Sequence, residues 1–491
     1  MSEICKLVPS QKGQVKLEIN GYLMIKDKNR NDLFYWHCEH KKTDIKCGAT
    51  ASTVLVGTEH YLRKHGEHNH AAEASKQIVL HTLSRIKESA KQTQDNPSQI
   101  IQNTLSQMPQ SCRPSMPSRE ALRKRIKRVR REELPPEPQS IDEFIVPEIF
   151  KNTLSGETFL LRDSTVGENR ILIFSTTAEI RHLAQAMYWI MDGTFKTVPT
   201  LFQQLYTIHA PVGGENSRIL PLVYALMTSK SQECYTRLFE DLRDLAEERK
   251  VELEPLYIIT DFELGAINAS RTVFPTIQNK GCFFHLGQSV WRKVQSLGLS
   301  KMYGENEDFS LIVRHLPALA FLPSAEIAAS FTQVKAEMPQ EADNLIAWFE
   351  ENYVLGRIRR TFRNGSASRH PPLFPPDLWS VYENNNLGLP RTQNKVEAWH
   401  RRWETLIGRA HVGVHFLFQN LQKEQQHVAN EVELIVRGEA RPALKKQYEQ
   451  RKERIQTIVD DRGNRCVMDF LRGKKLPTIC LFNFHVYTII F

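Results

Sequence analysis

The sequence predicts a mixed α/β protein in which a small β-rich unit precedes a larger unit with a mixed sheet and a mostly helical insertion. Short runs of alternating apolar and polar residues fill positions 15–70, as expected for a small antiparallel sheet. From residue 155 onward, apolar runs alternate with amphipathic helical patterns. The chain has 491 residues, too many for one hydrophobic core, so we expect about two to four compact units.

The positive charge of the chain is concentrated in its N-terminal part. The net charge is +9, and residues 1–140 contain 24 Lys and Arg against 15 Asp and Glu, so the remainder is formally neutral. Such a segment gathers near nucleic acid because it releases counterions from phosphates. A solvated basic tail is the alternative interpretation. We expect a polyanionic partner for this part of the chain.

The composition excludes several protein classes. Hydrophobic residues make up 41% and charged residues 25%, as in ordinary globular proteins. No run reaches the roughly 18 apolar residues that span a bilayer, so we expect no membrane association. The start lacks the apolar core of a signal peptide, so the eight cysteines are expected to be free or metal-bound rather than disulfide-bonded. The apolar C-terminus, 476–491, is expected to be a buried strand or an atypical terminus.

Four potential metal ligands lie close together in the N-terminal sheet. They are arranged as Cys38-x8-Cys47 and His68-x-His70, which is enough to close one tetrahedral zinc site. Histidines two residues apart on an extended segment point the same way. A fold of about 55 residues has a small apolar core and needs a cross-link such as a bound metal ion for stability. The alternative is a pair of unrelated buried cysteines with surface histidines. Other histidines nearby leave the choice of histidines more open than that of the cysteines.

A basic helix follows a helix at 75–92 and a Gln/Ser/Pro-rich linker at 93–117. Ser118 can cap this helix, and Pro135 stops it. Its cations are Arg123, Lys124, Arg125, Lys127, Arg128, Arg130 and Arg131. A nuclear-import signal, a DNA-backbone contact and a solvated helix all remain open as interpretations.

The larger unit begins with closely spaced strands. Expected strands cover residues 188–191, 201–212, 219–227, 256–261 and 276–285. The first three should form an antiparallel meander, because their connections are too short for a crossover helix. A helix at 231–250 precedes the strand at 256–261, and a short helix connects that strand to the strand at 276–285, so the last two strands should pair in parallel. This order is that of a ribonuclease-H-like sheet.

A largely helical segment, 286–390, separates this sheet from a final helix that begins near Asn394. Within it, the basic run RIRRTFR at 357–363 could face DNA or form a solvated helix face.

Three carboxylates are candidates for a divalent-metal site. Asp192 and Asp261 each follow an apolar run and meet at one sheet edge if those strands are neighbours. Phosphodiester chemistry uses such hard oxygen ligands to hold two Mg²⁺ ions about 3.5 to 4 Å apart. The alternative is a pair of strand-end turn aspartates, and Glu263 is a competing acid.

The third carboxylate is expected to be Glu397. A capping box is its alternative role, because Asn394 can cap the helix with Glu397 at the third position. His400 lies three residues further on and shares the face of Glu397.

Two stretches resemble known families. Residues LFYWHC at 33–38, then Cys47-Gly48-Ala49 and His68-Asn69-His70, resemble a FLYWCH-type zinc finger over about residues 10–71. This resemblance implies that Cys38, Cys47, His68 and His70 hold Zn²⁺, and that the finger binds DNA or another protein.

Residues MDGTFK, ITDFE and GCFFHLGQSVWRKVQ resemble the transposase core of Mutator-like elements (MULE), and the resemblance covers about residues 140–430. FLYWCH followed by MULE is itself a recognised order. The resemblance implies an Asp/Asp/Glu triad with Mg²⁺ or Mn²⁺, a final helical motif and a C-x2-H pair. The residues concerned are the triad Asp192, Asp261 and Glu397, the motif residues Asn394 and His400, and the pair Cys282 and His285. The pair could bind a second zinc, or it could be a packed Cys and a hydrogen-bonded His.

The sequence therefore predicts a nuclear, DNA-binding transposase-like protein that cleaves and joins DNA phosphodiesters. Expected partners are double-stranded DNA, a second copy of the chain on DNA, and a protein bound through the finger. Two alternatives stay open: a domesticated, catalytically silent DNA-binding regulator, and a zinc-dependent interaction protein on an inert scaffold. The expected domains are 10–71 (finger), 72–140 (helix, linker and basic helix), 141–430 (transposase core with its insertion at about 286–390) and 431–491 (helical region and apolar tail).

Overall fold

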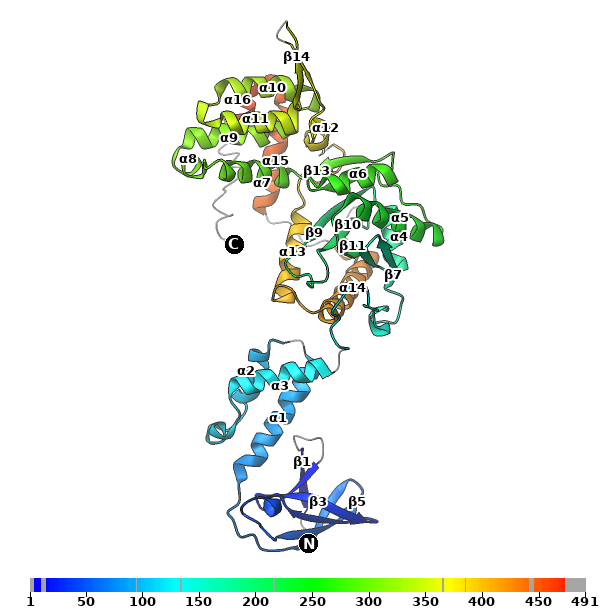
Figure 1. Ribbon diagram of the computed structural model, residues 1–491, viewed down its shortest axis with the longest axis vertical. Coiled ribbons are helices and arrows are strands. Elements are labelled where there is room, and N and C mark those ends of the chain that lie inside the picture. Colours follow the sequence, from blue (N-terminus) through cyan, green and yellow to red (C-terminus); the bar gives the residue numbers. More distant parts are fainter. Residues whose placement is uncertain are drawn as a thin grey trace. The chain divides into compact units, whose positions relative to one another are not determined.

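The computed structural model divides the chain into two compact units, Met1–Pro136 and Glu137–Phe491 (Figure 1). It describes residues 4–9, 15–93, 95–132, 135–214, 217–363, 366–384, 386–440 and 446–472. The apolar C-terminus at 476–491 lies outside the described residues. Within the described part, no helix combines the length and apolarity needed to cross a membrane.

The first unit begins with a closed barrel of six antiparallel strands. The strands are β1 (Ile4–Pro9), β2 (Val15–Ile19), β3 (Tyr22–Arg30), β4 (Leu33–Cys38), β5 (Thr50–Val56) and β6 (Glu59–His65). Pairing of β1 with β6, which sets Cys5 opposite His60, closes the barrel. Inside it, the indole of buried Trp36 donates to the Thr53 hydroxyl at 2.9 Å. The small β-rich unit is thus confirmed, and β1 extends it beyond the predicted start at residue 15.

The expected linker at 93–117 is wrong, because it contains a helix and a 3-10 turn. The elements after the barrel are α1 (Ala74–Gln92), α2 (Pro97–Ser106), η2 (Gln110–Ser115) and α3 (Arg119–Glu132). Asn96 and Gln99 form a capping box at the start of α2. Buried Ile100, Ile101 and Met108 join apolar residues of α1 and α3 in one core. Glutamine and serine dominate the composition of this segment, and they hid its few core residues.

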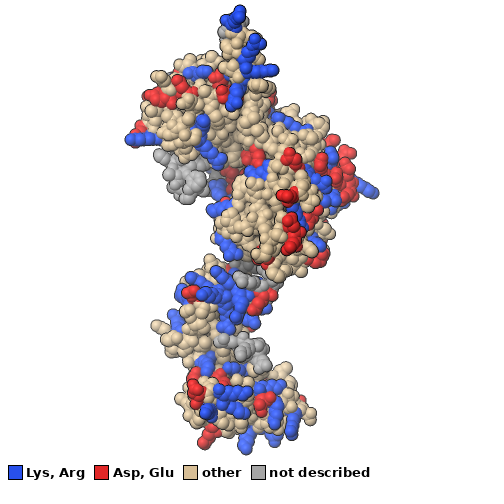
Figure 2. All heavy atoms as spheres, viewed as in Figure 1, with Lys and Arg blue, Asp and Glu red and all other residues tan. Residues whose placement is uncertain are grey.

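Helix α3 forms where predicted and turns its apolar stripe inward. Ser118 accepts a hydrogen bond from the backbone N–H of Ala121, and Leu122, Ile126 and Val129 are buried. Among its cations, Arg123, Lys124, Lys127 and Arg128 are exposed. Figure 2 shows a dense blue patch over this part of the first unit.

Arg130 differs from its neighbours because it closes the end of α1. Its guanidinium donates to the carbonyl oxygens of Ala90 at 3.1 Å, Thr93 at 2.8 Å and Asp95 at 2.8 Å. Ala90 lies in the last turn of α1, whose carbonyls lack partners within the helix, and Thr93 and Asp95 lie just beyond that helix. Arg130 therefore has a structural role in this segment.

We expect Arg130→Ala to destabilise the three-helix segment by about 1.5 to 3 kcal/mol, because it removes charged hydrogen-bond donors from the end of α1. Arg128→Ala is the matched control, since Arg128 is exposed on the same helix and pairs with Glu132 at 3.6 Å. Hydrogen exchange of the α1 amides measures the difference. Equal exchange in the two variants would show that Arg130 does not hold α1.

The second unit is built on a seven-stranded mixed sheet of order β13-β12-β9-β10-β11-β8-β7. Its strands are β7 (Leu160–Val166), β8 (Asn169–Phe174), β9 (Tyr188–Thr194), β10 (Gln204–Val212), β11 (Arg218–Met227), β12 (Tyr257–Thr260) and β13 (Gln278–Gly281). Strands β9, β10 and β11 form the predicted antiparallel meander, and β12 pairs in parallel with both β9 and β13. The mixed α/β fold is therefore confirmed. The β7–β8 hairpin at one edge was not predicted.

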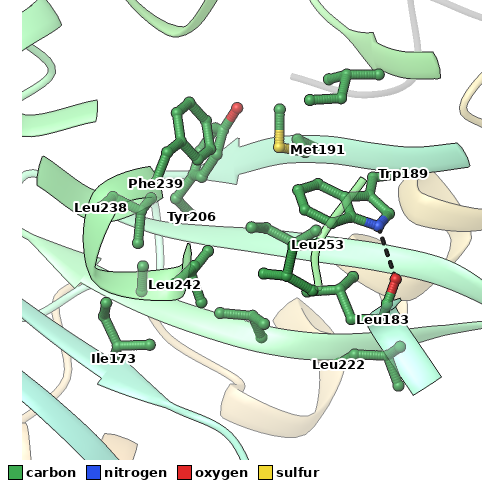
Figure 3. Packing of buried hydrophobic residues seen from close by; sticks show 14 of the residues in the cluster. Ile173, Leu183, Trp189, Met191, Tyr206, Leu222, Leu238, Phe239, Leu242 and Leu253 are labelled. Carbon is green, nitrogen blue, oxygen red and sulfur yellow. Dashed lines mark hydrogen bonds between the residues drawn. The ribbon is translucent and has the colours of Figure 1, made fainter. Parts of the chain in front are cut away.

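Helices cover both faces of this sheet. They are α4 (Thr177–Gln185), α5 (Gln232–Glu248), α6 (Leu264–Val273), α13 (Asn394–Ile407) and α14 (Val414–Val436). Trp189 and Met191 of β9 pack with α4, α5 and α6, and the Trp189 indole donates to the Leu183 carbonyl at 3.0 Å (Figure 3). Tyr188 and Ile190 point to the other face, where they pack with Val396 of α13.

The insertion is helical as predicted, and it has its own core. Its elements are α7 (Phe283–Ser296), α8 (Ser300–Glu305), α9 (Glu307–Ala318), α10 (Ser324–Glu337), α11 (Asp343–Phe349), the π-helical turn Glu350–Val354, β14 (Ile358–Thr361), β15 (Ala367–Arg369) and α12 (Pro376–Trp379). Helices α15 (Lys446–Asp460) and α16 (Val467–Arg472) pack into the same core.

Two expectations are corrected here. The basic run at 357–363 is not a helix face but one strand of a β-hairpin, since β14 pairs with β15. The expected strand at 276–285 is shorter, because β13 ends at Gly281 and Cys282 is the N-cap of helix α7. Continuous apolar character across GCFFHL hid this strand-to-helix change.

Candidate functional site

The barrel brings four metal-ligand side chains together. Ligand atoms of Cys38, Cys47, His68 and His70 all lie within 4.8 Å of one another, and both cysteines are fully buried. The Cys38 Sγ atom lies 3.2 Å from His70 Nε2, the Cys47 Sγ atom 3.4 Å from His68 Nδ1, and the two histidine nitrogens 3.2 Å apart. Zinc bonds of about 2.0 to 2.3 Å at tetrahedral angles give ligand separations of about 3.3 to 3.8 Å. The cluster therefore fits one zinc ion.

Neighbouring groups orient these ligands. The Nδ1 atom of His70 lies 3.0 Å from the Ala71 carbonyl oxygen, so it can donate there and leave Nε2 as the ligand atom. The Tyr22 ring stacks on His68 at 3.8 Å, and burial together with the nearby histidines lowers the His68 pKa to about 4. Burial opposes ionisation of Cys47, yet backbone N–H groups of Ala49 and Asn69 lower its pKa. A neutral imidazole and a thiolate are the forms that bind zinc.

In the second unit, two aspartates are aligned on neighbouring parallel strands. The register pairs Tyr257 with Tyr188 and Ile259 with Ile190, so Asp261 falls opposite Asp192 two residues further on. Alternation along β9 and β12 turns both aspartates to the face that α13 covers, as it does Ile190 and Ile259. Asp192 lies inside β9 rather than at its end. Asp261 also accepts a backbone hydrogen bond from Glu263 at 3.3 Å, which is a turn contact.

Helix α13 places Glu397 beside these strands through its N-cap residue. Gln393 is fully buried, and its amide donates to the carbonyl oxygens of Met191 and Ile259, both at 3.3 Å. Gln393, not Asn394, is the N-cap, and it makes no side-chain cap hydrogen bond. The capping-box interpretation of Glu397 is therefore wrong. Its Oε1 atom is buried and has no hydrogen-bond partner among the described residues.

The carboxylates influence one another electrostatically. Burial and then the charge of Asp192 raise the pKa of Asp261 to about 7, and the same two causes raise the pKa of Glu397 to about 7. Within the described residues, the cysteine–histidine cluster is the one set of three or more potential ligands close enough to share a metal ion. The three acids are thus neighbours, but their oxygen atoms are not close enough together to share one metal ion. Repulsion between their negative charges favours this separation. A cation there would relieve that repulsion.

Residues around the acids have distinct partners. His400 Nε2 lies 3.3 Å from an Asp192 carboxylate oxygen, so it faces Asp192. Lys230 lies 3.0 Å from Glu263 and also lowers the pKa of Asp261. Glu263 is therefore already paired. The sequence analysis missed Gln393 and Lys230, because neither an amide nor a lone lysine carries a spacing signal.

Cys282 and His285 lie at the start of α7, close to the acids. Burial raises the Cys282 pKa to about 12, and the backbone N–H of Cys282 donates to Thr260 at 3.0 Å. Burial lowers the His285 pKa, whereas nearby Asp192 acts to raise it. No third ligand joins the pair in the described part of the chain. Cys282 is packed, as the alternative interpretation expects, but the hydrogen bond expected of His285 is not found at its Nδ1 atom, which is buried without a partner among the described residues.

Two protein-family models match parts of this chain. The model of the FLYWCH zinc finger domain matches residues 7–70, which include the whole cysteine–histidine cluster. The model of the MULE transposase domain matches residues 188–289, which include both aspartates but end before Glu397. A search of curated proteins found no match. The chain thus carries a FLYWCH zinc finger domain followed by a MULE transposase domain.

Proposed function

We propose that this protein binds DNA in the nucleus and cleaves and joins DNA phosphodiesters with two Mg²⁺ or Mn²⁺ ions held by Asp192, Asp261 and Glu397. The site would lie on a ribonuclease-H-like sheet. The observation that carries the proposal is the alignment of two aspartates on parallel strands with an unbonded, buried Glu397 oxygen beside them. These are hard oxygen donors, as Mg²⁺ requires.

Each residue has a part in this proposal. The three carboxylates would hold the cations, and bound cations would lower the pKa of the attacking oxygen and stabilise the leaving oxygen. His400 would fix the orientation of the Asp192 carboxylate, which it contacts at 3.3 Å. Pairing with Lys230 would keep Glu263 out of the ligand set.

The first unit supports DNA binding independently of cleavage. The zinc finger domain and the exposed cations of α3 lie in the part of the chain that carries the positive charge. Phosphate contacts of this kind weaken as salt rises, because binding releases counterions from the DNA and a higher salt concentration makes that release less favourable. A nuclear-import role of the α3 cations would be compatible with DNA binding.

The test uses the full chain and duplex DNA taken from the flanks of its coding region, and a search of those flanks for terminal inverted repeats precedes it. We expect nicking with Mg²⁺ or Mn²⁺ and none with EDTA, at protein concentrations where binding is complete. Binding without nicking under every metal condition would reject the enzyme and favour the silent DNA-binding regulator.

A further inference from the structure

The hairpin β14–β15 projects from the insertion and is exposed along its first strand. All four residues of β14 are exposed, and Figure 2 shows blue side chains on the hairpin where Figure 1 labels β14. The hairpin and its flanks carry Arg357, Arg359, Arg360, Arg363 and Arg369. Positions 355–370 contain no acidic residue. Positive charges at this density repel one another and do not stabilise the hairpin itself. A negatively charged binding partner would explain them.

The root of the hairpin is firmly held. Arg369 donates to the Glu350 carboxylate at 2.9 Å and to the Gly356 carbonyl at 2.8 Å, and Lys335 donates to the same carboxylate at 2.6 Å. Gly356 has a φ of +83°, and a Cβ there would overlap the backbone of His370. One arginine thus serves the fold, and the hairpin has a fixed base.

The remaining arginines are available to a partner. Arg359, Arg360 and Arg363 form no ion pair with any residue that the structure describes. Arg357 is 78% exposed and lies 3.9 Å from Glu351, a weak contact at the surface. Four guanidinium groups are therefore presented to solvent.

Apolar side chains accompany these cations. Ile358 is 49% exposed and Phe362 is 45% exposed, and the Arg360 guanidinium lies over the Phe362 ring at 5.5 Å. Arginine pairs with phosphates, and an exposed aromatic ring packs against sugars or bases. Arginines beside the exposed Phe362 ring favour nucleic acid as the partner over a purely acidic protein surface, because an acidic surface would pair with the arginines alone.

The hairpin's root is packed against the strand end that carries Asp261. The neighbouring Phe262 ring contacts Tyr353 at 5.7 Å and Phe374 at 5.0 Å between ring centres. Tyr353 lies in the π-helical turn that also contains Glu350. The hairpin is therefore attached to the same packed region as the carboxylates.

We propose that β14–β15 is a two-stranded ribbon that enters a groove of duplex DNA, with its arginines on the phosphates and Phe362 against the groove. The major groove admits such a ribbon. This inference rests on the proposed DNA-binding function and adds a contact outside both matched domains.

The test compares two double variants of the full chain for binding to duplex DNA across a salt series. Arg359→Ala/Arg360→Ala should weaken binding about tenfold. It should also reduce the salt slope, which is the slope of log affinity against log salt concentration, by about 1 to 2, because a complex with fewer phosphate contacts releases fewer counterions when it forms. The control, Arg181→Ala/Arg243→Ala, removes the same charge from exposed positions on α4 and α5. It should leave the slope unchanged. Equal slopes for the two variants would overturn the inference.

Phe362→Ala separates groove entry from a backbone contact. We expect it to lower affinity without changing the salt slope, because the ring is uncharged. Unchanged affinity would reject groove entry. Wild type that does not bind DNA at low salt would reject the proposed function itself, whereas wild type that binds while the arginine variant matches it would reject only the hairpin. The same variants are also tested for binding to vesicles of acidic lipid. If Arg359→Ala/Arg360→Ala lost binding to these vesicles but not to DNA, the hairpin would be assigned to a membrane and the inference would be overturned.

Discussion

Cys47→Ser is expected to remove zinc and unfold the barrel of the first unit while leaving the second unit intact. Cys47 is fully buried, and its Sγ atom lies 3.4 Å from His68 Nδ1 in the four-ligand cluster. Zinc contributes about 10 kcal/mol or more to the folding of small fingers, which exceeds the few kcal/mol that a barrel of this size supplies alone. Metal content and hydrogen exchange resolved by segment measure both effects.

Cys5→Ser is the matched control because Cys5 is also buried in this barrel but is not one of the clustered ligands. It should keep one zinc per chain and the exchange protection of the barrel strands. Chelation of the wild type should reproduce the Cys47→Ser result. Full protection of the barrel amides from hydrogen exchange in zinc-free protein would show that the apolar core is enough to fold the barrel. The interpretation that zinc is needed for its folding would then be wrong.

The sequence predicted the finger well because its ligands are rare residue types at short spacing. Cys38 and Cys47 lie nine residues apart and His68 and His70 two apart. Cys38 ends β4, Cys47 lies in the short loop before β5, and both histidines directly follow β6, so each pair is placed by a short local segment. Closure of the barrel depends instead on pairing between β1 and β6, which are 55 residues apart at Cys5 and His60. A pairing of that separation leaves no periodic signal in either strand.

In the second unit, the strands of the mixed sheet were predictable from the sequence, whereas the side chains that hold the elements together were less so. The apolar runs gave the meander and the parallel pair, because burial on both faces requires continuous apolar sequence. The role of Gln393 was not predictable, since a glutamine that bonds two strand carbonyls looks the same in sequence as a surface glutamine. The same holds for Arg130, which closes α1 across 40 residues of sequence although it lies in a run of cations.

The second large effect is expected from the carboxylates. Asp192→Asn, Asp261→Asn and Glu397→Gln should each lower metal-dependent DNA cleavage by about 10³-fold or more, corresponding to about 4 kcal/mol in the activation free energy. Each change keeps the side-chain shape but removes a charged oxygen ligand of the divalent cations. Single-turnover cleavage at saturating protein measures the rate.

Binding must be measured alongside cleavage, because the proposal assigns DNA affinity largely to other residues. We expect the three variants to bind duplex DNA as tightly as wild type in Ca²⁺. Glu404→Gln is the matched control for Glu397→Gln: it lies on the same helix, two turns further on, and pairs with Lys196 at 3.2 Å. Its cleavage rate should stay near that of wild type.

Glu263→Gln decides between the two candidates for the third acid. Glu263 is only two residues from Asp261, but Lys230 holds it at 3.0 Å, whereas the Oε1 atom of Glu397 is buried without a partner among the described residues. An unpaired buried carboxylate is costly unless a cation or proton compensates it, so Glu397 is the acid that a metal would stabilise. Loss of cleavage in Glu263→Gln with activity retained in Glu397→Gln would reverse this assignment and leave α13 with a purely structural role.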